Sequence, residues 1–234
     1  MTHVLSSVAV ARIAMMALLG SVMATPALAA PIGVPTATVG AGKTTLGGEV
    51  NILVDRDLAA TGAGEAESLQ AFAKGAIGVD SRLDLEFRMG LGDIAVDGTN
   101  LDSDIGPAFG GGFKVTWATI PEANLKIGSV LQTVHVRADD GDQRRSWTEY
   151  DAALGAVFDT GAGRDPRQAR PQFVVLPYGG LAWSGADLSG GTAEDDGFGV
   201  FLGAAMETAG ALSFGAELRL LDQIALSLFL AMGF

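Results

Sequence analysis

Stretches in which apolar and polar side chains alternate recur along the chain from residue 44 to the end. In RLDLEFRMGL one parity is apolar throughout, with Leu83, Leu85, Phe87, Met89 and Leu91. The other parity carries Asp84, Glu86 and Arg88. Because successive side chains of a β-strand point to opposite faces, each such stretch predicts a strand with one apolar and one polar face.

The same alternation predicts ten strands, at 44–55, 70–79, 82–92, 108–119, 125–137, 147–158, 172–184, 198–208, 211–221 and 223–234. Most are longer than the strands of soluble proteins and match the roughly 9 to 11 tilted residues that cross a hydrocarbon core. A parity change near Gly128–Val130 predicts a β-bulge, and Pro177 is an awkward residue for a closed ladder.

The connections between these strands alternate in length. Tight turns are expected at 80–81, 121–124 and 209–210, and longer acidic loops at 56–69, 93–107, 138–146 and 185–197. Short turns on one side and long loops on the other predict an all-β, transmembrane, antiparallel up-and-down barrel over residues 44–234. The connections at 159–171 and 222–223 break the rule, so eight strands stay open as an alternative to ten.

Other parts of the sequence agree with a membrane barrel. No segment after residue 29 has 18 uninterrupted apolar residues, which excludes helical spans. Aromatic residues fall near strand ends and predict two girdles, one of Trp117, Phe158 and Phe234 and one of Phe109, Trp147, Tyr150 and Trp183. The alternative is a soluble β-sandwich or lipocalin-like barrel, which would turn its apolar faces inward.

The first 29 residues have the three parts of a secretory signal peptide. Arg12 precedes an apolar run over 13–23, and Ala27-Leu28-Ala29 forms the cleavage site. We expect cleavage after Ala29 or one residue later, followed by a periplasmic linker over 30–43. The chain has no cysteine, so it carries neither a lipoprotein signal nor a disulfide.

ATVGAGKTTLGG, residues 37–48, matches a permissive nucleotide-binding pattern through Gly42-Lys43-Thr44. A phosphate-binding loop needs a strand before it and a helix after it, because the helix N-terminus holds the phosphates. Here a proline-containing stretch precedes the motif and a strand pattern follows it, so we expect no nucleotide binding.

The last strand links this chain to a known group. The sequence resembles the small outer-membrane barrels of the outer membrane protein A and opacity-protein type, through its export signal, its alternating strands and its apolar C-terminal signature of Leu226, Leu228, Leu230, Met232 and Phe234. Met232 stands where that group often has tyrosine. The resemblance implies insertion into a Gram-negative outer membrane by the barrel assembly machinery, with outer-membrane lipid and lipopolysaccharide as partners.

The polar parity predicts a charged barrel interior. It carries six acids and five bases, namely Glu49, Lys74, Asp84, Glu86, Arg88, Lys114, Lys126, Glu149, Asp151, Glu217 and Arg219. Small barrels fill their interiors with side chains, and buried charges are tolerable there when they are paired. These residues predict either a lumen plugged by ion pairs or a narrow conducting path.

Enzymatic and ligand-binding signals are weak. His135 is the single histidine after the signal peptide, and although Asp139 and Asp140 follow it, no nucleophile can be named. We expect no cofactor and no metal site, since DGTNLDSD at 97–104 lacks the spacing of an EF-hand, although the acidic loops leave divalent cations open as partners. The net charge of −12 argues against nucleic acid.

These observations predict an outer-membrane barrel with a structural or surface-interaction role and a lumen plugged by paired charges. The alternatives are a small nonspecific porin and a barrel hydrolase that uses His135.

Overall fold

The computed structural model describes residues 31–56, 66–93, 95–96, 101–140, 143–160, 173–188, 192–193, 197–220 and 223–234. The expected signal peptide at 1–29 lies outside these residues. No helix in the described ranges is long and apolar enough to cross a membrane.

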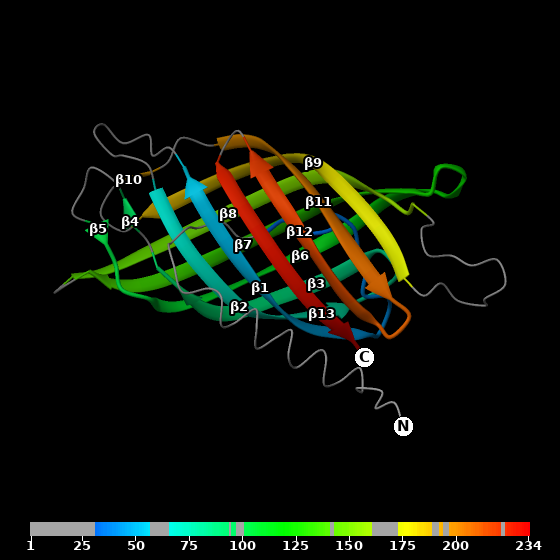
Figure 1. Ribbon diagram of the computed structural model, residues 1–234, viewed down its shortest axis with the longest axis horizontal. Coiled ribbons are helices and arrows are strands. Elements are labelled where there is room, and N and C mark those ends of the chain that lie inside the picture. Colours follow the sequence, from blue (N-terminus) through cyan, green and yellow to red (C-terminus); the bar gives the residue numbers. More distant parts are fainter. Residues whose placement is uncertain are drawn as a thin grey trace, which may run out of the picture.

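Ten long strands form the body of the molecule (Figure 1). They are β1 (Thr44–Asp55), β2 (Ala66–Gly78), β3 (Leu83–Gly92), β6 (Gly106–Ile120), β7 (Leu125–Asp140), β8 (Gln143–Phe158), β9 (Phe173–Leu188), β11 (Gly197–Thr208), β12 (Leu212–Leu220) and β13 (Ile224–Gly233). Three two-residue strands, β4 (Ala95–Val96), β5 (Leu101–Asp102) and β10 (Thr192–Ala193), lie in the connections, and a 3-10 turn at Pro121–Ala123 joins β6 to β7.

The sheet closes on itself. Each long strand pairs antiparallel with its neighbours in the chain, and β1 pairs with both β2 and β13. Val50, for example, lies opposite Ala71 on one side and Leu228 on the other. The predicted all-β barrel is therefore confirmed with ten strands, and the eight-stranded alternative is wrong.

Some boundaries differ from the sequence prediction. The loop expected at 138–146 is mostly ladder, because β7 and β8 stay paired as far as Asp140 and Gln143. The bulge predicted at Gly128 is instead on the neighbouring strand, where the register shifts between Thr116 and Ala118. Pro177 is accommodated because the pairing of β9 with β8 ends beside it, at Tyr178.

The Gly42-Lys43-Thr44 motif lies at the start of the barrel wall. Gly42 has a positive φ of 72° and its amide donates to the carbonyl of Gly78, 2.8 Å away. β1 begins at Thr44. The prediction that a strand rather than a helix follows the motif is confirmed.

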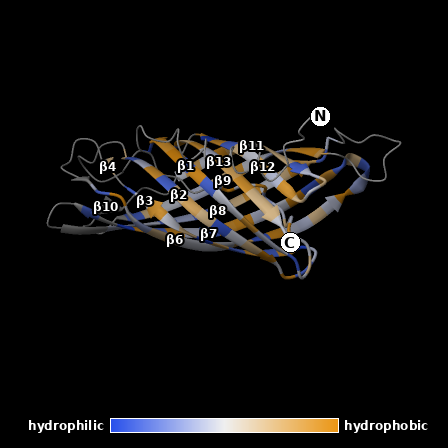
Figure 2. Cartoon of the chain, turned by 60° about the horizontal axis from the view of Figure 1, so that its bottom comes forward, coloured by the Kyte–Doolittle hydropathy of each residue, from blue (hydrophilic) through white to orange (hydrophobic). Residues whose placement is uncertain are grey.

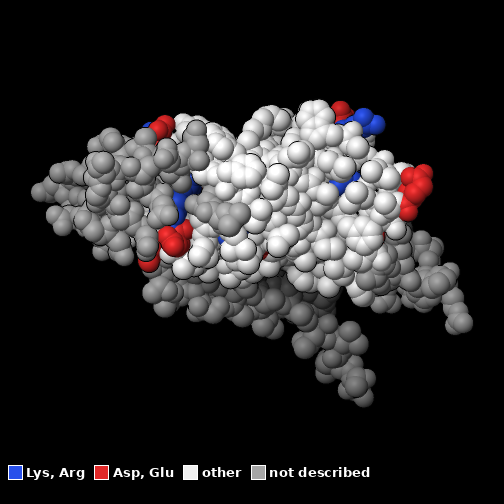
Figure 3. Space-filling view, turned by 90° about the horizontal axis from the view of Figure 1, so that it is seen from above, with Lys and Arg blue, Asp and Glu red and all other residues white. Residues whose placement is uncertain are grey.

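The outer surface of the barrel is apolar. Leu85, Met89 and Leu202 are 47%, 67% and 60% exposed. On the face seen in Figure 3, few charged atoms are visible in the middle of the described surface, and most of the acidic and basic residues lie toward its ends. Hydrophobic and hydrophilic residues alternate along the strands (Figure 2). A closed antiparallel barrel with this exterior is an integral outer-membrane protein, as the sequence predicted.

The C-terminal signature faces the same surface. Leu226, Leu228, Met232 and Phe234 are 37–68% exposed on the outer face and Leu230 is partly exposed, whereas Ala225 and Ser227, of the opposite parity, are buried in the barrel. Recognition of this strand by the assembly machinery stays a prediction.

The two aromatic girdles are largely confirmed. Trp117 and Phe158 are exposed near the turn end, and Phe109, Tyr150 and Trp183 are exposed toward the loop end. Trp147 was placed wrongly, because its side chain is 1% exposed inside the barrel. Trp147 has the same parity in β8 as Glu149 and Asp151, which face the lumen. This parity predicts its inward position, whereas its aromatic character alone suggested a girdle.

We expect Leu202→Arg, in the middle of β11, to lower the free energy of unfolding by roughly 2–4 kcal/mol, because the middle of a bilayer cannot solvate the guanidinium. Leu46→Arg, an equally outward change near the turn end, should cost no more than about 1 kcal/mol. Urea titration in lipid vesicles measures both. Equal costs at the two positions would contradict the placement of the bilayer around the barrel.

Candidate functional site in the barrel interior

The predicted interior charges do face the lumen. Ten of the eleven are buried or nearly so: Glu49, Lys74, Asp84, Glu86, Arg88, Lys114, Glu149, Asp151, Glu217 and Arg219. Lys126 is the exception, since it is exposed near the turn end of β7. The strand parity explains this outcome, because every second residue of each strand points to the barrel axis.

A central cluster joins strands β1, β2, β3 and β6. Lys74 and Lys114 lie 3.0 and 3.1 Å from the carboxylate of Glu86. Arg88 lies 3.1 Å from Glu49, which Lys74 approaches at 3.5 Å. Each carboxylate thus meets at least two cations, and this mutual pairing offsets the cost of taking the charges out of water.

Gln132 connects this cluster to a second one. The Arg88 guanidinium donates to Gln132 Oε1 at 3.0 Å, and Gln132 Nε2 donates to Asp151 at 2.9 Å. Asp151 in turn accepts from Arg219 at 2.7 Å. Gln132 was not among the predicted interior residues because it carries no charge, although its position in the strand has the inward parity.

A third ion pair lies nearer the loop end. Arg56 contacts Glu149 at 2.8 Å and also donates to Gln223 at 3.1 Å. Its guanidinium lies 5.5 Å from the centre of the buried Trp147 ring. The sequence placed Arg56 in a solvent loop, whereas its side chain is fully buried.

The main departure from the sequence prediction is the N-terminal segment. Residues 31–37, expected in a periplasmic linker over 30–43, are buried. Their hydrogen-bond partners are inward-facing side chains of the barrel, so residues 31–39 lie within the lumen. We call residues 31–39 the lumen segment.

Two carboxylates hold the lumen segment through its backbone. The amides of Ile32 and Gly33 each donate to Glu217, both at 2.8 Å. Gly33 has a positive φ of 67°, a conformation that favours glycine and aims successive amides at one anion. The amides of Thr38 and Val39 donate to Asp84 at 2.6 and 3.0 Å.

Two further hydrogen bonds and an apolar cluster also hold the lumen segment in the barrel. The Ala37 amide donates to Thr116 Oγ1 at 3.0 Å, and the Pro31 carbonyl accepts from Gln132 at 3.1 Å. Ile32 and Val34 pack in one hydrophobic cluster with Val130, Ala153, Val157, Tyr178, Ala182, Phe201 and Ala205. A short proline-containing peptide has no ladder of its own, so the lumen side chains satisfy its backbone instead.

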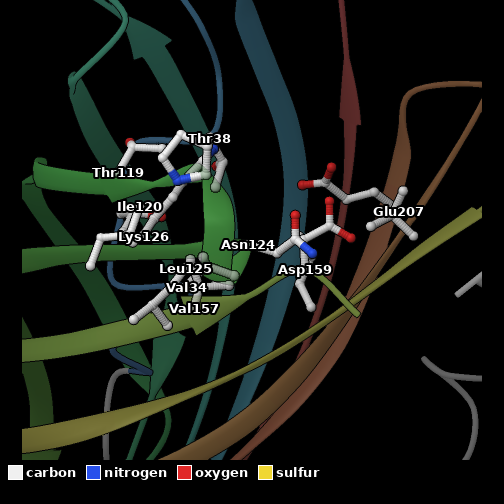
Figure 4. A pocket seen from close by; sticks show the side chains of 14 residues that line it. Val34, Thr38, Thr119, Ile120, Asn124, Leu125, Lys126, Val157, Asp159 and Glu207 are labelled. Atoms are coloured by element: carbon white, nitrogen blue, oxygen red, sulfur yellow. The ribbon is translucent and has the colours of Figure 1, made fainter. Parts of the chain in front are cut away.

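The turn end of the lumen opens into a cavity of about 340 Å³. Lys126, Asp159 and Glu207 line it together with Val34 and Thr38 of the lumen segment (Figure 4). The two carboxylates lie on the same side in this view, across from the segment. Lys126 therefore belongs to the mouth of the barrel rather than to the central ion-pair cluster.

His135 lies apart from these groups. Its Nδ1 is 2.8 Å from Thr148 Oγ1, and Arg137 Nε donates to its Nε2 at 3.3 Å. The ring packs against exposed Phe109 in a tilted arrangement, with a centroid distance of 5.1 Å and an interplanar angle of 51°. Both ring nitrogens of His135 therefore have partners, Thr148 and Arg137.

The charged groups of the interior contact partners on other strands or on the lumen segment. Among the described residues, no three His, Cys, Asp or Glu side chains come together as a metal site. Residues 97–100, half of the acidic stretch at 97–104, lie outside the described residues, so cation binding by this stretch stays a prediction.

Comparison with known proteins gives distant likenesses. No family model matches the chain, and no curated protein matches it. The fold is similar to the COG4313 outer membrane channel from Pseudomonas putida F1, with 14% identity over 88% of this chain and 100% of that one, at a TM-score of 0.48. It is also similar to the beta domain of the Bordetella autotransporter BrkA, with 15% identity over 83% and 100%, at a TM-score of 0.48. Neither likeness carries an argument about activity.

We expect Arg88→Met to destabilise the barrel by about 3–5 kcal/mol, because it leaves the buried Glu49 and Glu86 with one cation fewer. Arg82→Met, in the exposed turn between β2 and β3, should change stability by less than about 0.5 kcal/mol. Unfolding in vesicles compares the two. A neutral Arg88→Met would show that the central cluster contributes nothing to the fold.

Proposed function

We propose that the protein is an outer-membrane barrel with a structural or surface-interaction role, and that the lumen segment and the ion pairs keep its interior closed. The observation that carries this proposal is the burial of residues 31–37 among inward-facing side chains. A pore needs a continuous aqueous path, and here the centre of a ten-stranded barrel holds a peptide as well as charged side chains.

The closure has two layers that support each other. Glu217 and Asp84 hold the lumen segment at two points, and Gln132 connects its first residue to the central cluster. Hydrogen bonds to a charged acceptor are worth about 1.5–3 kcal/mol each, so four such backbone bonds favour the seated segment. With the transport path closed, the features left for interaction are the loop end and the lipid-facing surface.

A resemblance to the outer membrane protein A and opacity-protein type supports the same role. Small barrels of that type fill their interior with side chains. This chain has ten strands where the smallest members of that class have eight. Membership of the class is therefore part of the proposal.

A small channel is the second candidate. A cavity of about 90 Å³ lies between the lumen segment and the barrel wall, with lining residues on β1, β2, β3, β6, β11, β12 and β13. Glu49, Lys74, Glu86 and Lys114 line it, and these charges would suit the passage of ions. A hydrolase has less support. His135 Nε2 accepts from Arg137, so Nδ1 carries the proton and donates to the Thr148 hydroxyl instead of acting as its base.

We expect the native protein to be silent in a planar lipid bilayer. Gly33→Val should produce conductance steps, because valine does not tolerate the positive φ that aims the segment at Glu217, and its Cβ would lie 3.0 Å from Lys114 Nζ. Gly42→Val is the matched control: it has a similar positive φ but lies in open space outside the lumen, so it should stay silent.

Discrete and reproducible steps from the native protein would contradict the closed barrel and favour the channel. Conductance from Gly42→Val equal to that from Gly33→Val would show that backbone strain, rather than seating of the lumen segment, opens the path.

A further inference from the structure

The lumen segment has a direction. Pro31 lies deepest, bonded to Gln132 near the middle of β7. The chain then passes Thr116 and Asp84 and reaches the turn end, where Gly42 bonds to Gly78 and β1 begins at Thr44. The segment therefore points from the turn end up into the closed lumen, with its N-terminal side innermost.

This direction conflicts with an attached signal peptide. The turn end of an outer-membrane barrel faces the periplasm, and the signal peptide holds the chain at the inner membrane on that same side. A chain held there by its N-terminus cannot place Pro31 at the centre of a closed barrel without threading a loop through it, and folded chains avoid such threading.

We propose that the lumen segment enters the barrel as a free chain end, so that removal of the signal peptide is the step that permits closure. The inference rests on the proposed closed lumen. The processed N-terminus is then a functional element of the mature protein, and its site is the inner end of the lumen at Gln132 and Asp151.

The charges of the interior fit this arrangement. The three ion-pair clusters and the two carboxylates that hold the lumen segment together comprise six carboxylates (Glu49, Asp84, Glu86, Glu149, Asp151 and Glu217) and five cations (Arg56, Lys74, Arg88, Lys114 and Arg219). Cleavage just before the segment creates one ammonium group next to Pro31. Gln132 donates to both the Pro31 carbonyl and Asp151, so this carboxylate lies near the new chain end. The ammonium group supplies a sixth positive charge where carboxylates are in excess, which lowers the cost of their burial.

The absence of cysteine from the sequence gives a direct test. Thr36→Cys places a single thiol in the lumen segment, where Thr36 is 1% exposed. Ser81→Cys places the control thiol in the exposed turn between β2 and β3. In the protein purified from outer membranes, we expect a bulky maleimide to label Thr36→Cys at least about tenfold more slowly than Ser81→Cys, and equally fast after unfolding.

The decisive comparison blocks the chain end. A small folded domain inserted between residues 29 and 30, behind the same signal, leaves the barrel sequence intact but prevents threading. We expect Thr36→Cys in this fusion to be labelled as fast as Ser81→Cys. Continued protection of Thr36→Cys in the fusion would overturn the inference. If the fusion does not insert, an intact-mass measurement on the protected Thr36→Cys protein decides: retained residues 1–29 overturn the inference, and their absence supports it.

The outcomes separate this inference from the proposed function. If the native protein does not conduct and the Thr36→Cys thiol is protected in the fusion, the closed barrel is supported and only the entry of a free chain end is contradicted. If the native protein conducts, and Thr36→Cys without the inserted domain is labelled as fast as Ser81→Cys, both the closed barrel and the entry of a free chain end are contradicted.

Discussion

The structure depends on the need to satisfy every backbone amide and carbonyl where no water is present. In a bilayer, strands meet this need when the sheet has no free edge. The pairing of β1 with both β2 and β13 provides that closure. Once the sheet is closed, the period of two residues sends one face of each strand to lipid and the other to a narrow interior.

That narrow interior imposes a second requirement. The inner face of the barrel must be polar to differ from the outer face. Its polar side chains lose most of their water in the narrow interior, so they must bind each other. Gln132 shows how tightly this is done, since one amide group bonds to Arg88, Asp151 and Pro31. The backbone of the lumen segment has the same requirement as the side chains, and Glu217 and Asp84 meet it.

The sequence predicts the wall of the barrel well and its contents less well. Strands such as β1 and β3 were predicted to within a residue because alternation is a local signal, carried by each stretch alone. The lumen segment, Arg56 and Trp147 were missed because their positions depend on partners far along the chain, such as Glu217, Glu149 and the interior apolar cluster. A proline-containing peptide looks like a linker until a carboxylate on another strand accepts its amides.

The positions of the three tryptophans make them useful intrinsic fluorescence probes. Trp117 and Trp183 lie on the outer surface toward opposite ends of the barrel, while Trp147 is enclosed beside Arg56. Quenchers dissolved in lipid can reach the first two rings and not the third. The tryptophan fluorescence of the unlabelled protein therefore distinguishes changes at the lipid-facing surface from changes in the lumen.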